Sequence, residues 1–216
     1  MSLLNVSIID YGIGNLYSVQ QAFERCGATV RLARTPRDIE LAEKLVLPGV
    51  GAFADGMLEL NRRELTGPIL EYAASNRPLL GICLGMQMLA TSSEEFKLSH
   101  GLDLIPGKVK KINTKTASGA ELRLPHTGWT KIYQTKLGCW DESILNGCKD
   151  GVAVYLVHSY ALSTEDNSSV LAECSYGDNR IATVVRKGNI YGCQFHPEKS
   201  GLDGLKILSN FLTRLS

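Results

Sequence analysis

The stretch of sequence that decides the fold is Leu79-Leu80-Gly81-Ile82-Cys83-Leu84-Gly85-Met86-Gln87. Its first four residues predict a short buried strand, and a helix is predicted from Leu84 to about Ala90. Cys83 stands at the junction, between glycines two positions before and two positions after it. This is the pattern of a nucleophile elbow with cysteine in place of serine, because the sharp turn and its closely packed neighbours require glycine. A strand that turns directly into a helix favours an α/β protein.

The N-terminal half repeats this alternation of short apolar runs and helical patterns, which is typical of a mostly parallel sheet covered by helices. In the C-terminal half, strand-like runs with tight turns replace the helical patterns, so we expect antiparallel strands to extend the sheet. No repeat or linker divides the chain, and we expect one domain over residues 1–216. Strands are predicted at 6–9, 29–32, 45–47, 79–82, 109–112, 122–124, 130–133, 152–157, 169–174, 181–186 and 190–195, and helices from 16 to a stop at 27, at 36–42, after the loop 48–51, at 84–90 and at 202–212.

The composition excludes several classes of protein. Apolar residues make up 44% of the chain and charged residues 21%, which is typical of a folded globular protein. Lys and Arg number 23 against 22 Asp and Glu, so no basic footprint for nucleic acid is visible. The longest apolar stretches, such as 152–157, are too short to cross a bilayer, and residues 1–10 lack the features of a secretion signal. We expect a cytoplasmic protein with neither a nucleic-acid nor a membrane partner.

The sequence predicts neither a metal nor a cofactor. The six cysteines include no C-x-x-C pair and no cysteine–histidine spacing of the zinc type. Gly12-Ile13-Gly14 follows the first predicted strand, but Tyr17 stands where a dinucleotide-binding motif has its third glycine. No phosphate-binding loop of the G-x-x-x-x-G-K-[ST] type occurs either.

The same local pattern would arise if Cys83 were only a buried structural cysteine between turn glycines. A nearby base would favour a catalytic role instead. His196 follows a predicted strand, and Glu198 lies two residues further on. A carboxylate beside an imidazole fixes its tautomer and stabilises the imidazolium, which would complete a triad of nucleophile, base and orienting group. Acyl transfer also needs donors for the oxyanion, which the backbone N–H of Leu84 and that of Val50 or Gly51 can supply.

Together these segments resemble the class I, triad-type glutamine amidotransferases and, among them, the glutaminase subunits of imidazole glycerol phosphate synthases. The resemblance covers nearly the whole chain, and its motifs occur in the same order. The segments that carry it are Gly81–Gln87, His196–Glu198, Pro48–Phe53, Ser93–Glu95, Gly101–Gly107, Pro125–Trp129, Val157–Tyr160 and Gln194–Ser200. The family implies a flavodoxin-like open sheet with helices on both faces and a mixed extension.

The resemblance also implies an activity and a partner. Enzymes of this kind hydrolyse glutamine to glutamate and pass the ammonia through a tunnel to a (β/α)₈-barrel cyclase with which they form a heterodimer. Cys83 would form the thioester, with His196 as acid and base and Glu198 orienting it. The implied substrate-binding residues are Gly51, Leu84, Gln87, Ser159 and Tyr160, and those at the interface or tunnel are Asn15, Trp129, Tyr155 and Lys199.

Two departures concern the partner rather than the glutaminase chemistry. Thr130 stands where the family usually has asparagine, and the polar segment 136–150 has no clear counterpart. A related subunit that supplies ammonia to another synthetase, such as a sugar amidotransferase of surface polysaccharide biosynthesis, therefore remains an alternative. A binding subunit with a vestigial site would need a broken triad, and a cysteine peptidase is disfavoured by Gln87 and Val157–Tyr160.

Overall fold

The strands and helices form mostly where the apolar runs predict them. The computed structural model of the chain describes residues 4–214. The helix α2 illustrates the local reasons: Pro36 occupies its first turn, and Thr35 and Asp38 form a reciprocal capping box. The elements of the first half are β1 (Leu4–Ile9), α1 (Leu16–Arg25), β2 (Ala28–Ala33), α2 (Pro36–Glu40), β3 (Leu45–Gly49), α3 (Phe53–Arg62), α4 (Thr66–Ala74), β4 (Leu79–Cys83), α5 (Leu84–Met88), β5 (Ser92–Ser93), β6 (Ser99–His100) and β7 (Gly107–Lys111).

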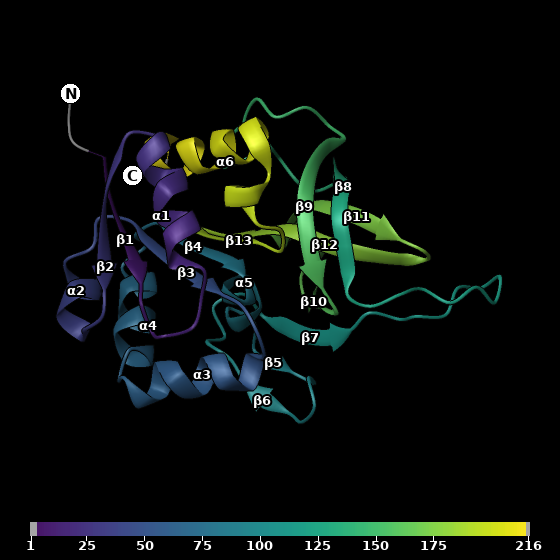
Figure 1. Ribbon diagram of the computed structural model, residues 1–216, viewed down its shortest axis with the longest axis horizontal. Coiled ribbons are helices and arrows are strands. Elements are labelled where there is room, and N and C mark those ends of the chain that lie inside the picture. Colours follow the sequence, from purple (N-terminus) through teal and green to yellow (C-terminus); the bar gives the residue numbers. More distant parts are fainter. Residues whose placement is uncertain (1–3, 215–216) are drawn as a thin grey trace.

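The second half is built mainly of strands and ends in a long helix (Figure 1). Its elements are β8 (His126–Gln134), β9 (Val152–His158), β10 (Tyr160–Thr164), the 3₁₀ turn η1 (Asn167–Ser169), β11 (Val170–Tyr176), β12 (Asn179–Lys187), β13 (Ile190–Cys193), the 3₁₀ turn η2 (Pro197–Lys199) and α6 (Gly201–Arg214).

One mixed sheet of nine strands runs through the molecule in the order β2-β1-β3-β4-β13-β12-β11-β8-β9. The first five strands in this order are parallel, and the remaining four are antiparallel. With β13 as its fifth strand, the parallel part has the 2-1-3-4-5 order of flavodoxin-like sheets. The predicted fold class, a mostly parallel α/β sheet with an antiparallel extension, is confirmed. The carboxyl ends of β3 and β4 lie side by side, since Gly49 pairs with Cys83.

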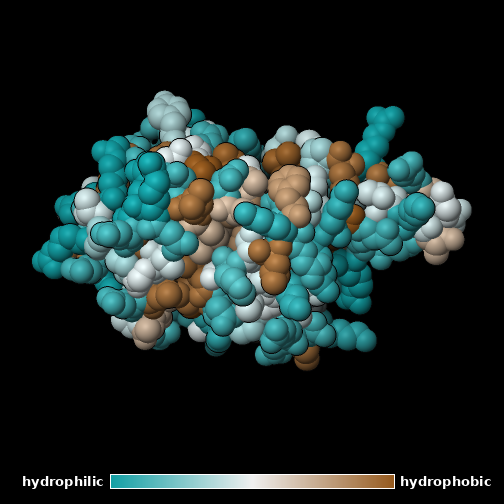
Figure 2. Space-filling model, turned by 90° about the horizontal axis from the view of Figure 1, so that it is seen from below, coloured by the Kyte–Doolittle hydropathy of each residue, from teal (hydrophilic) through white to brown (hydrophobic). Residues whose placement is uncertain are grey.

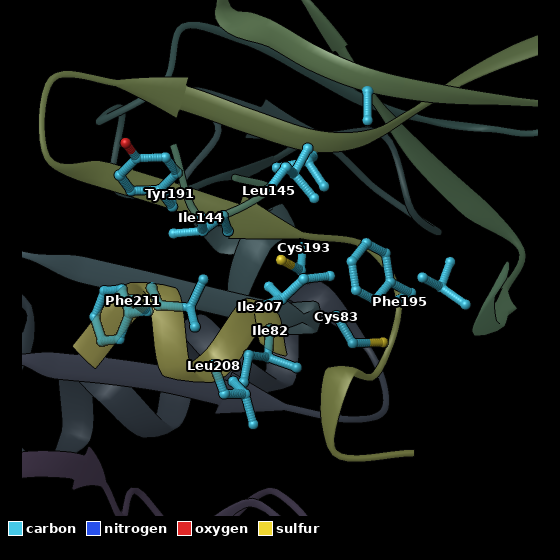
Figure 3. Close-up of a cluster of buried hydrophobic side chains, with 14 of the residues drawn as sticks. Ile82, Cys83, Ile144, Leu145, Tyr191, Cys193, Phe195, Ile207, Leu208 and Phe211 are labelled. Carbon is cyan, nitrogen blue, oxygen red and sulfur yellow. The ribbon is translucent and has the colours of Figure 1, made fainter. Parts of the chain in front are cut away.

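Helices cover both faces of the parallel part and bury two apolar clusters (Figure 1). On one face α1 and α6 pack together through the rings of Phe23 and Phe211, whose centroids are 6.3 Å apart. Figure 3 shows Ile207 and Leu208 of α6 beside Ile82, the residue that precedes Cys83 in β4. On the other face, Phe53 of α3 and Tyr72 of α4 are fully buried. The segment around Cys83 is thus held between the two layers.

A second sheet, which the sequence pattern does not predict, has the order β10-β7-β5-β6. The strand β10 begins two residues after β9 ends, so the chain passes from the large sheet to the small one at Ser159. The strand β5 follows α5 closely. The small sheet therefore contains two strands from distant parts of the chain, β5 and β10, and each of them lies close in sequence to a residue predicted at the site.

Three expectations about the elements need correction. Residues 122–124 form no strand; the only pairing nearby is an isolated bridge between Lys115 and Glu121, and Pro125, which lacks an N–H, follows directly. One helix was expected between 51 and 79, but Glu64 adopts a φ of 58° and divides this stretch into α3 and α4. The segment 136–150, interpreted as polar from its sequence, forms a loop that buries Trp140, Ile144 and Leu145 in the core.

Within residues 4–214, no helix has the length and apolar character that a bilayer crossing demands. The face seen in Figure 2 is mostly hydrophilic, with hydrophobic groups gathered toward its middle. The most exposed large apolar side chains of the described residues include Phe96, Leu202 and Tyr17.

Candidate active site

The elbow at Cys83 has the strained geometry that its sequence predicts. Cys83 adopts φ 55° and ψ −109°, a region that residues with a side chain rarely occupy. A Cβ atom at Gly81 would lie 2.7 Å from the backbone nitrogen of Met86, and one at Gly85 would lie 1.7 Å from the carbonyl oxygen of Leu47. Both glycines are therefore required by packing, and the turn leaves Cys83 no room to shift.

His196 and Glu198 form a buried pair. The Nδ1 atom of His196 lies 2.8 Å from Oε1 of Glu198, and their side chains are 4% and 1% exposed. The other carboxylate oxygen is buried with no hydrogen-bond partner among the described residues. Burial alone would lower the pKa of His196, but hydrogen bonds with Cys83 and Glu198 and their charges outweigh it and raise that pKa to about 9. At neutral pH the imidazole of His196 is therefore protonated on both nitrogens, next to the sulfur of Cys83.

The backbone of His196 is fixed as firmly as its ring. Its N–H donates to the carbonyl of Tyr155 (3.0 Å), and its carbonyl accepts from the hydroxyl of Ser200 (2.7 Å). Ser200 Oγ in turn accepts from the N–H of Tyr155 (3.0 Å). The strand β9 and the turn η2 are thus joined next to the reacting groups.

The segment 48–51 lies against the elbow. A Cβ at Gly49 would meet the hydroxyl of Tyr11 at 2.5 Å and the Cβ of Leu84 at 3.0 Å. Gly51 differs, because its φ is +91° and nothing lies within 4 Å of where its Cβ would be. The start of the segment is packed tightly, whereas its end is open.

Tyr11 anchors the start of this segment. Its fully buried hydroxyl donates to the carbonyl of Pro48 (2.9 Å). Burial, with a smaller contribution from the nearby Cys83, raises the pKa of Tyr11 above its ordinary value, so the hydroxyl keeps its proton and remains a donor. The Pro48–Gly49 peptide is thereby held in one orientation.

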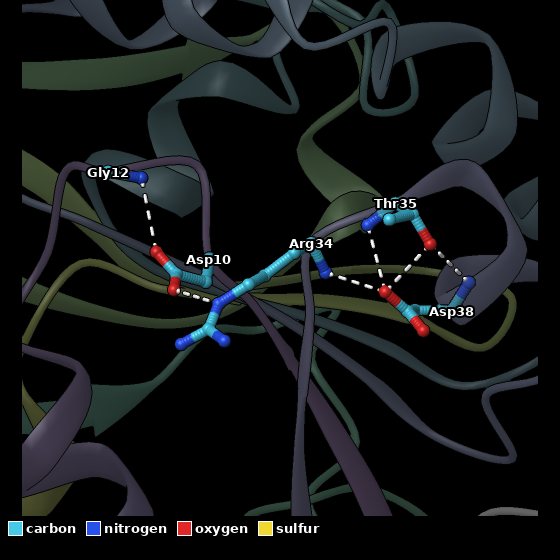
Figure 4. A network of polar contacts seen from close by, with 5 residues as sticks. All are labelled: Asp10, Gly12, Arg34, Thr35 and Asp38. Atoms are coloured by element: carbon cyan, nitrogen blue, oxygen red, sulfur yellow. Dashed lines mark hydrogen bonds and ion pairs between the residues drawn. The ribbon is translucent and has the colours of Figure 1, made fainter.

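The turn after β1 that carries Tyr11 is fixed by the polar network of Figure 4. Asp10 accepts from the N–H of Gly12 (3.2 Å) and pairs with Arg34 (2.8 Å). The N–H of Arg34 donates to Asp38, which also closes the capping box of α2. Although Gly12 belongs to the candidate nucleotide turn, the guanidinium of Arg63 lies 2.7 Å from where its Cβ would be. The turn serves to place Tyr11.

A cavity of about 390 Å³ brings the predicted substrate-binding residues together with the nucleophile. Gln87 lies at its base, and its amide nitrogen donates to the carbonyl of Tyr160 (3.0 Å) and to Oε1 of Gln194 (3.0 Å). Since both donors are used, Gln87 can offer a ligand only its carbonyl oxygen. The lining residues are Val50, Gly51, Cys83, Leu84, Gln87, Glu95, Phe96, Pro125, Val157, His158, Ser159, Tyr160 and His196.

Glu95 is a lining residue whose role the sequence did not indicate, although Ser93-Glu94-Glu95 is one of the segments that carry the resemblance. One of its oxygens accepts from the N–H of Phe53 at the start of α3 (2.7 Å). No hydrogen bond to the other oxygen is found within residues 4–214. The contact joins residues 42 positions apart, which no local pattern reveals.

The residues expected at a partner interface lie around η2. The rings of Trp129 and Tyr155 meet edge to face with centroids 6.3 Å apart, and Trp129 is 60% exposed. Lys199 is exposed within η2, and Asn15 is exposed at the start of α1, which packs against η2. The hydroxyl of Thr130 instead contacts the protein interior, where it lies 3.0 Å from Nε2 of His126.

The other cysteines occupy different environments from Cys83. Burial raises the pKa of Cys174 to about 12, and Cys193 is fully buried. Cys139 is exposed, while Cys26 and Cys148 are partly buried. In residues 4–214, no group of three or more His, Cys, Asp or Glu side chains is placed to hold a metal ion.

The comparisons with known proteins agree with this geometry. The protein "Imidazole glycerol phosphate synthase subunit HisH 1" of Legionella pneumophila is 45% identical over 209 residues, which are 96% of this chain and 98% of that protein. The subunit HisH of Methanosarcina acetivorans is 48% identical over 208 residues, 96% of this chain and 97% of that protein. A solved glutamine amidotransferase, 18% identical, shares the fold with a TM-score of 0.71 over 96% of both chains.

The family model described as "Glutamine amidotransferase class-I" matches residues 7–215, a range that includes the elbow, the segment 48–51 and the His196–Glu198 pair. The chain therefore belongs to the class-I glutamine amidotransferase family.

Proposed function

We propose that the chain is the glutaminase subunit of an imidazole glycerol phosphate synthase and supplies ammonia for histidine biosynthesis. The observation that carries the proposal is the convergence of Cys83, Gln87 and His196 on one cavity, with His196 paired to the buried Glu198. The identity of 45–48% over nearly the full length of HisH subunits supports the assignment to this synthase.

The reaction follows from the protonation of the triad. Cys83 attacks the carboxamide carbon of glutamine as a thiolate, with the proton of the Cys83–His196 pair held on Nε2 of His196, and the N–H groups of Leu84 and of Val50 or Gly51 stabilise the oxyanion. His196, protonated at neutral pH, donates its proton to the departing nitrogen, so that ammonia and a thioester form. The neutral imidazole then takes a proton from water, which attacks the thioester and releases glutamate. Glu198 keeps Nδ1 of His196 protonated and the ring in place throughout.

The cavity supplies acceptors for the ammonium group of glutamine. We assign this role to the carbonyl oxygen of Gln87 and the second carboxylate oxygen of Glu95. Internal hydrogen bonds already orient both side chains. Ser159 and Tyr160 also line the cavity and would bind the carboxylate. These contacts are the same in the ground state and in the transition state, so they contribute to glutamine affinity more than to the chemical step.

The partner would be a (β/α)₈-barrel cyclase that docks over Asn15, Trp129, Tyr155 and Lys199. Ammonia released at Cys83 would be protonated and diluted in bulk water, so a protected path must begin beside the sulfur. Trp129, a large exposed aromatic side chain next to η2, is the kind of residue that anchors an interface.

The experiment compares Cys83→Ala with Cys83-containing protein in complex with a histidine-pathway cyclase and its phosphoribosyl substrate. We expect the variant to lose glutamine-dependent product formation and to retain ammonia-dependent formation, because the acceptor chemistry belongs to the partner. Cys139→Ala, which changes an exposed cysteine away from the cavity, is the control and should keep both activities.

Glutamine-dependent product formation by Cys83→Ala would exclude Cys83 as the nucleophile. If the unmodified chain hydrolyses glutamine but neither binds nor responds to the cyclase, the partner assignment is wrong and the ammonia must serve another synthetase, of which the sugar amidotransferases are one kind.

A further inference from the structure

Two buried histidines beside the cavity have no part in the reaction described above. His126 on β8 and His158 on β9 are each 5% exposed and stand directly opposite each other in the strand register. Nδ1 of His126 lies 3.2 Å from Nε2 of His158. Burial lowers the pKa of His126 and lowers that of His158 to about 4, so both rings are neutral at neutral pH.

The contacts of the two rings impose one direction on their hydrogen bonds. Nδ1 of His158 lies 2.9 Å from the carbonyl oxygen of Tyr160, which can only accept, so this nitrogen carries the proton. The neutral ring then has an unprotonated Nε2, which accepts from Nδ1–H of His126. His126 in turn has an unprotonated Nε2, which accepts from the hydroxyl of Thr130 at 3.0 Å. Every donor in the series has an acceptor.

The series ends where the chain passes from one strand ladder to the other. This bend is held from the β7 side, because Tyr160 pairs with Lys111 and the carbonyl of Ser159 accepts from the N–H of Ile112 (3.0 Å). Ser159 is the single residue between β9 of the large sheet and β10 of the small one (Figure 1). The carbonyl of Tyr160 accepts from both His158 and Gln87, so the two hydrogen bonds converge on one oxygen next to this bend. Ser159 and Tyr160 both line the cavity.

We propose that Thr130, His126 and His158 form a hydrogen-bond relay that positions the Ser159–Tyr160 bend for glutamine binding. The inference rests on the proposed function, since it assigns the bend to the substrate carboxylate. His126 and His158 are positioning residues, because they act through Tyr160 and not on the reacting atoms themselves. A parallel stack of His126 on Tyr176, with centroids 4.0 Å apart and planes 12° apart, fixes the ring plane that the relay needs.

The relay begins one residue from Trp129, at the proposed docking face. Thr130 projects from the opposite side of β8 to Trp129, as consecutive strand residues do. The same short segment of β8 thus contributes a side chain to the docking face and the first donor of the relay. This explains why a hydroxyl at 130 suffices where the family usually has an amide: its partner, His126, lies within the strand and not across an interface.

A matched pair of variants tests the relay. His158→Asn places an amide nitrogen where Nδ1 stood and keeps the donor to Tyr160, whereas His158→Leu has nearly the same shape as asparagine and no donor. In the complex with the cyclase, we expect the glutamine KM of the leucine variant to be about five- to tenfold above that of the asparagine variant. The kcat values should agree within about twofold, because the lost hydrogen bond supports substrate binding equally in the ground state and in the transition state. Equal KM values for the two variants, or a loss confined to kcat, would overturn the proposal.

A second measurement is independent of activity. Nitrogen-15 spectra of the imidazoles in the full chain should show the proton on Nδ1 in both His126 and His158. The Nε2 resonance of His126 should move in Thr130→Val and stay in place in Thr130→Ser. A proton on Nε2 of His158 would refute the relay even if the chain is a glutaminase, whereas absence of glutamine turnover with the expected tautomers would refute the proposed function alone.

Discussion

Two glycine-containing turns meet at the cavity, and they differ in how much freedom their packing leaves. At the elbow, Gly85 lies so close to the carbonyl of Leu47 that not even a methyl group fits. In the segment 48–51, Gly51 has open space around it and a backbone angle that favours glycine. The proposed nucleophile is therefore fixed by its neighbours, whereas the end of the segment 48–51, the proposed oxyanion segment, has no atom packed where a side chain at Gly51 would lie.

The difference suggests where control of the activity resides. A peptide between Val50 and Gly51 can rotate its N–H toward or away from the oxyanion at little cost, because no packed side chain must move. The contacts that the proposed triad needs, between His196 and Glu198 and between His196 and Cys83, are in contrast already present in the isolated chain. We expect the isolated chain to hydrolyse glutamine weakly and to be activated when the loaded partner orients this peptide.

The largest expected effect is on the elbow. Gly85→Ala should destabilise the protein by more than about 4 kcal/mol or prevent folding, because the methyl group would overlap backbone that cannot move. Thermal and denaturant unfolding measure the loss. Gly67→Ala in α4, where nothing lies within 4 Å, is the control and should be neutral or slightly stabilising. An elbow variant as stable as the control would mean that the turn is less tightly packed than described.

A substitution at Gly51 should affect the catalytic rate more than the stability. Gly51→Ala should cost only about 1–2 kcal/mol of stability, the ordinary penalty of a left-handed residue, but lower partner-stimulated glutaminase activity by about 100-fold through misalignment of the donor. Gly27→Ala carries the same strain at φ +84° in a turn remote from the cavity and should leave the rate unchanged. If both variants had the same activity, the 50–51 peptide would not supply an oxyanion donor.

The fixed triad predicts a pH dependence of stability. The pKa of His196 rises from an ordinary 6.5 to about 9 on folding, so its stabilising contribution is complete below pH 6.5 and is lost as the pH rises through about 9. Compared with His196→Gln, the unmodified protein should lose about 1–3 kcal/mol of unfolding free energy between these pH values. Urea unfolding at pH 6, 8 and 10 measures the difference. Parallel curves for the two proteins would show that folding does not raise the pKa of His196.

The smallest expected effect concerns the anchored start of the segment 48–51. Tyr11→Phe removes one hydrogen bond to Pro48, worth about 1 kcal/mol, and should lower the stimulated kcat about fivefold by loosening the oxyanion segment. Tyr72→Phe removes buried hydrogen bonds to Glu43 and Pro78 far from the cavity and should affect stability alone. Equal kcat values for the two variants would limit Tyr11 to a structural role.

The sequence predicted those parts of the fold that depend on local patterns. The strands and helices around Cys83 follow from apolar runs and glycines, and the triad follows from two short motifs that each lie at the end of a strand. The strand β10 was missed because no glycine or proline marks the bend at Ser159, and β5 and β6 were missed because two-residue strands carry no periodicity.

The remaining features of the site depend on contacts between distant residues. Tyr11 and Pro48 are 37 positions apart, and His126 and His158 are 32 positions apart. Although His126 lies in one of the segments that carry the resemblance, no local pattern indicates the long-range partner of Tyr11 or of His126. The wrong strand at 122–124 has the opposite cause, because its apolar pattern is genuine but Pro125 and the absence of a neighbouring strand leave it unpaired.

The most direct test of a fixed nucleophile and a reorientable oxyanion segment measures two rates on the same sample. Glutamine hydrolysis requires the oxyanion donors, whereas alkylation of Cys83 by iodoacetamide displaces iodide and forms no oxyanion. On addition of cyclase loaded with its acceptor substrate, we predict that hydrolysis accelerates by about 100-fold or more while alkylation of Cys83 does not accelerate. Full hydrolysis by the chain alone, or alkylation that rises in proportion to hydrolysis, would contradict the account.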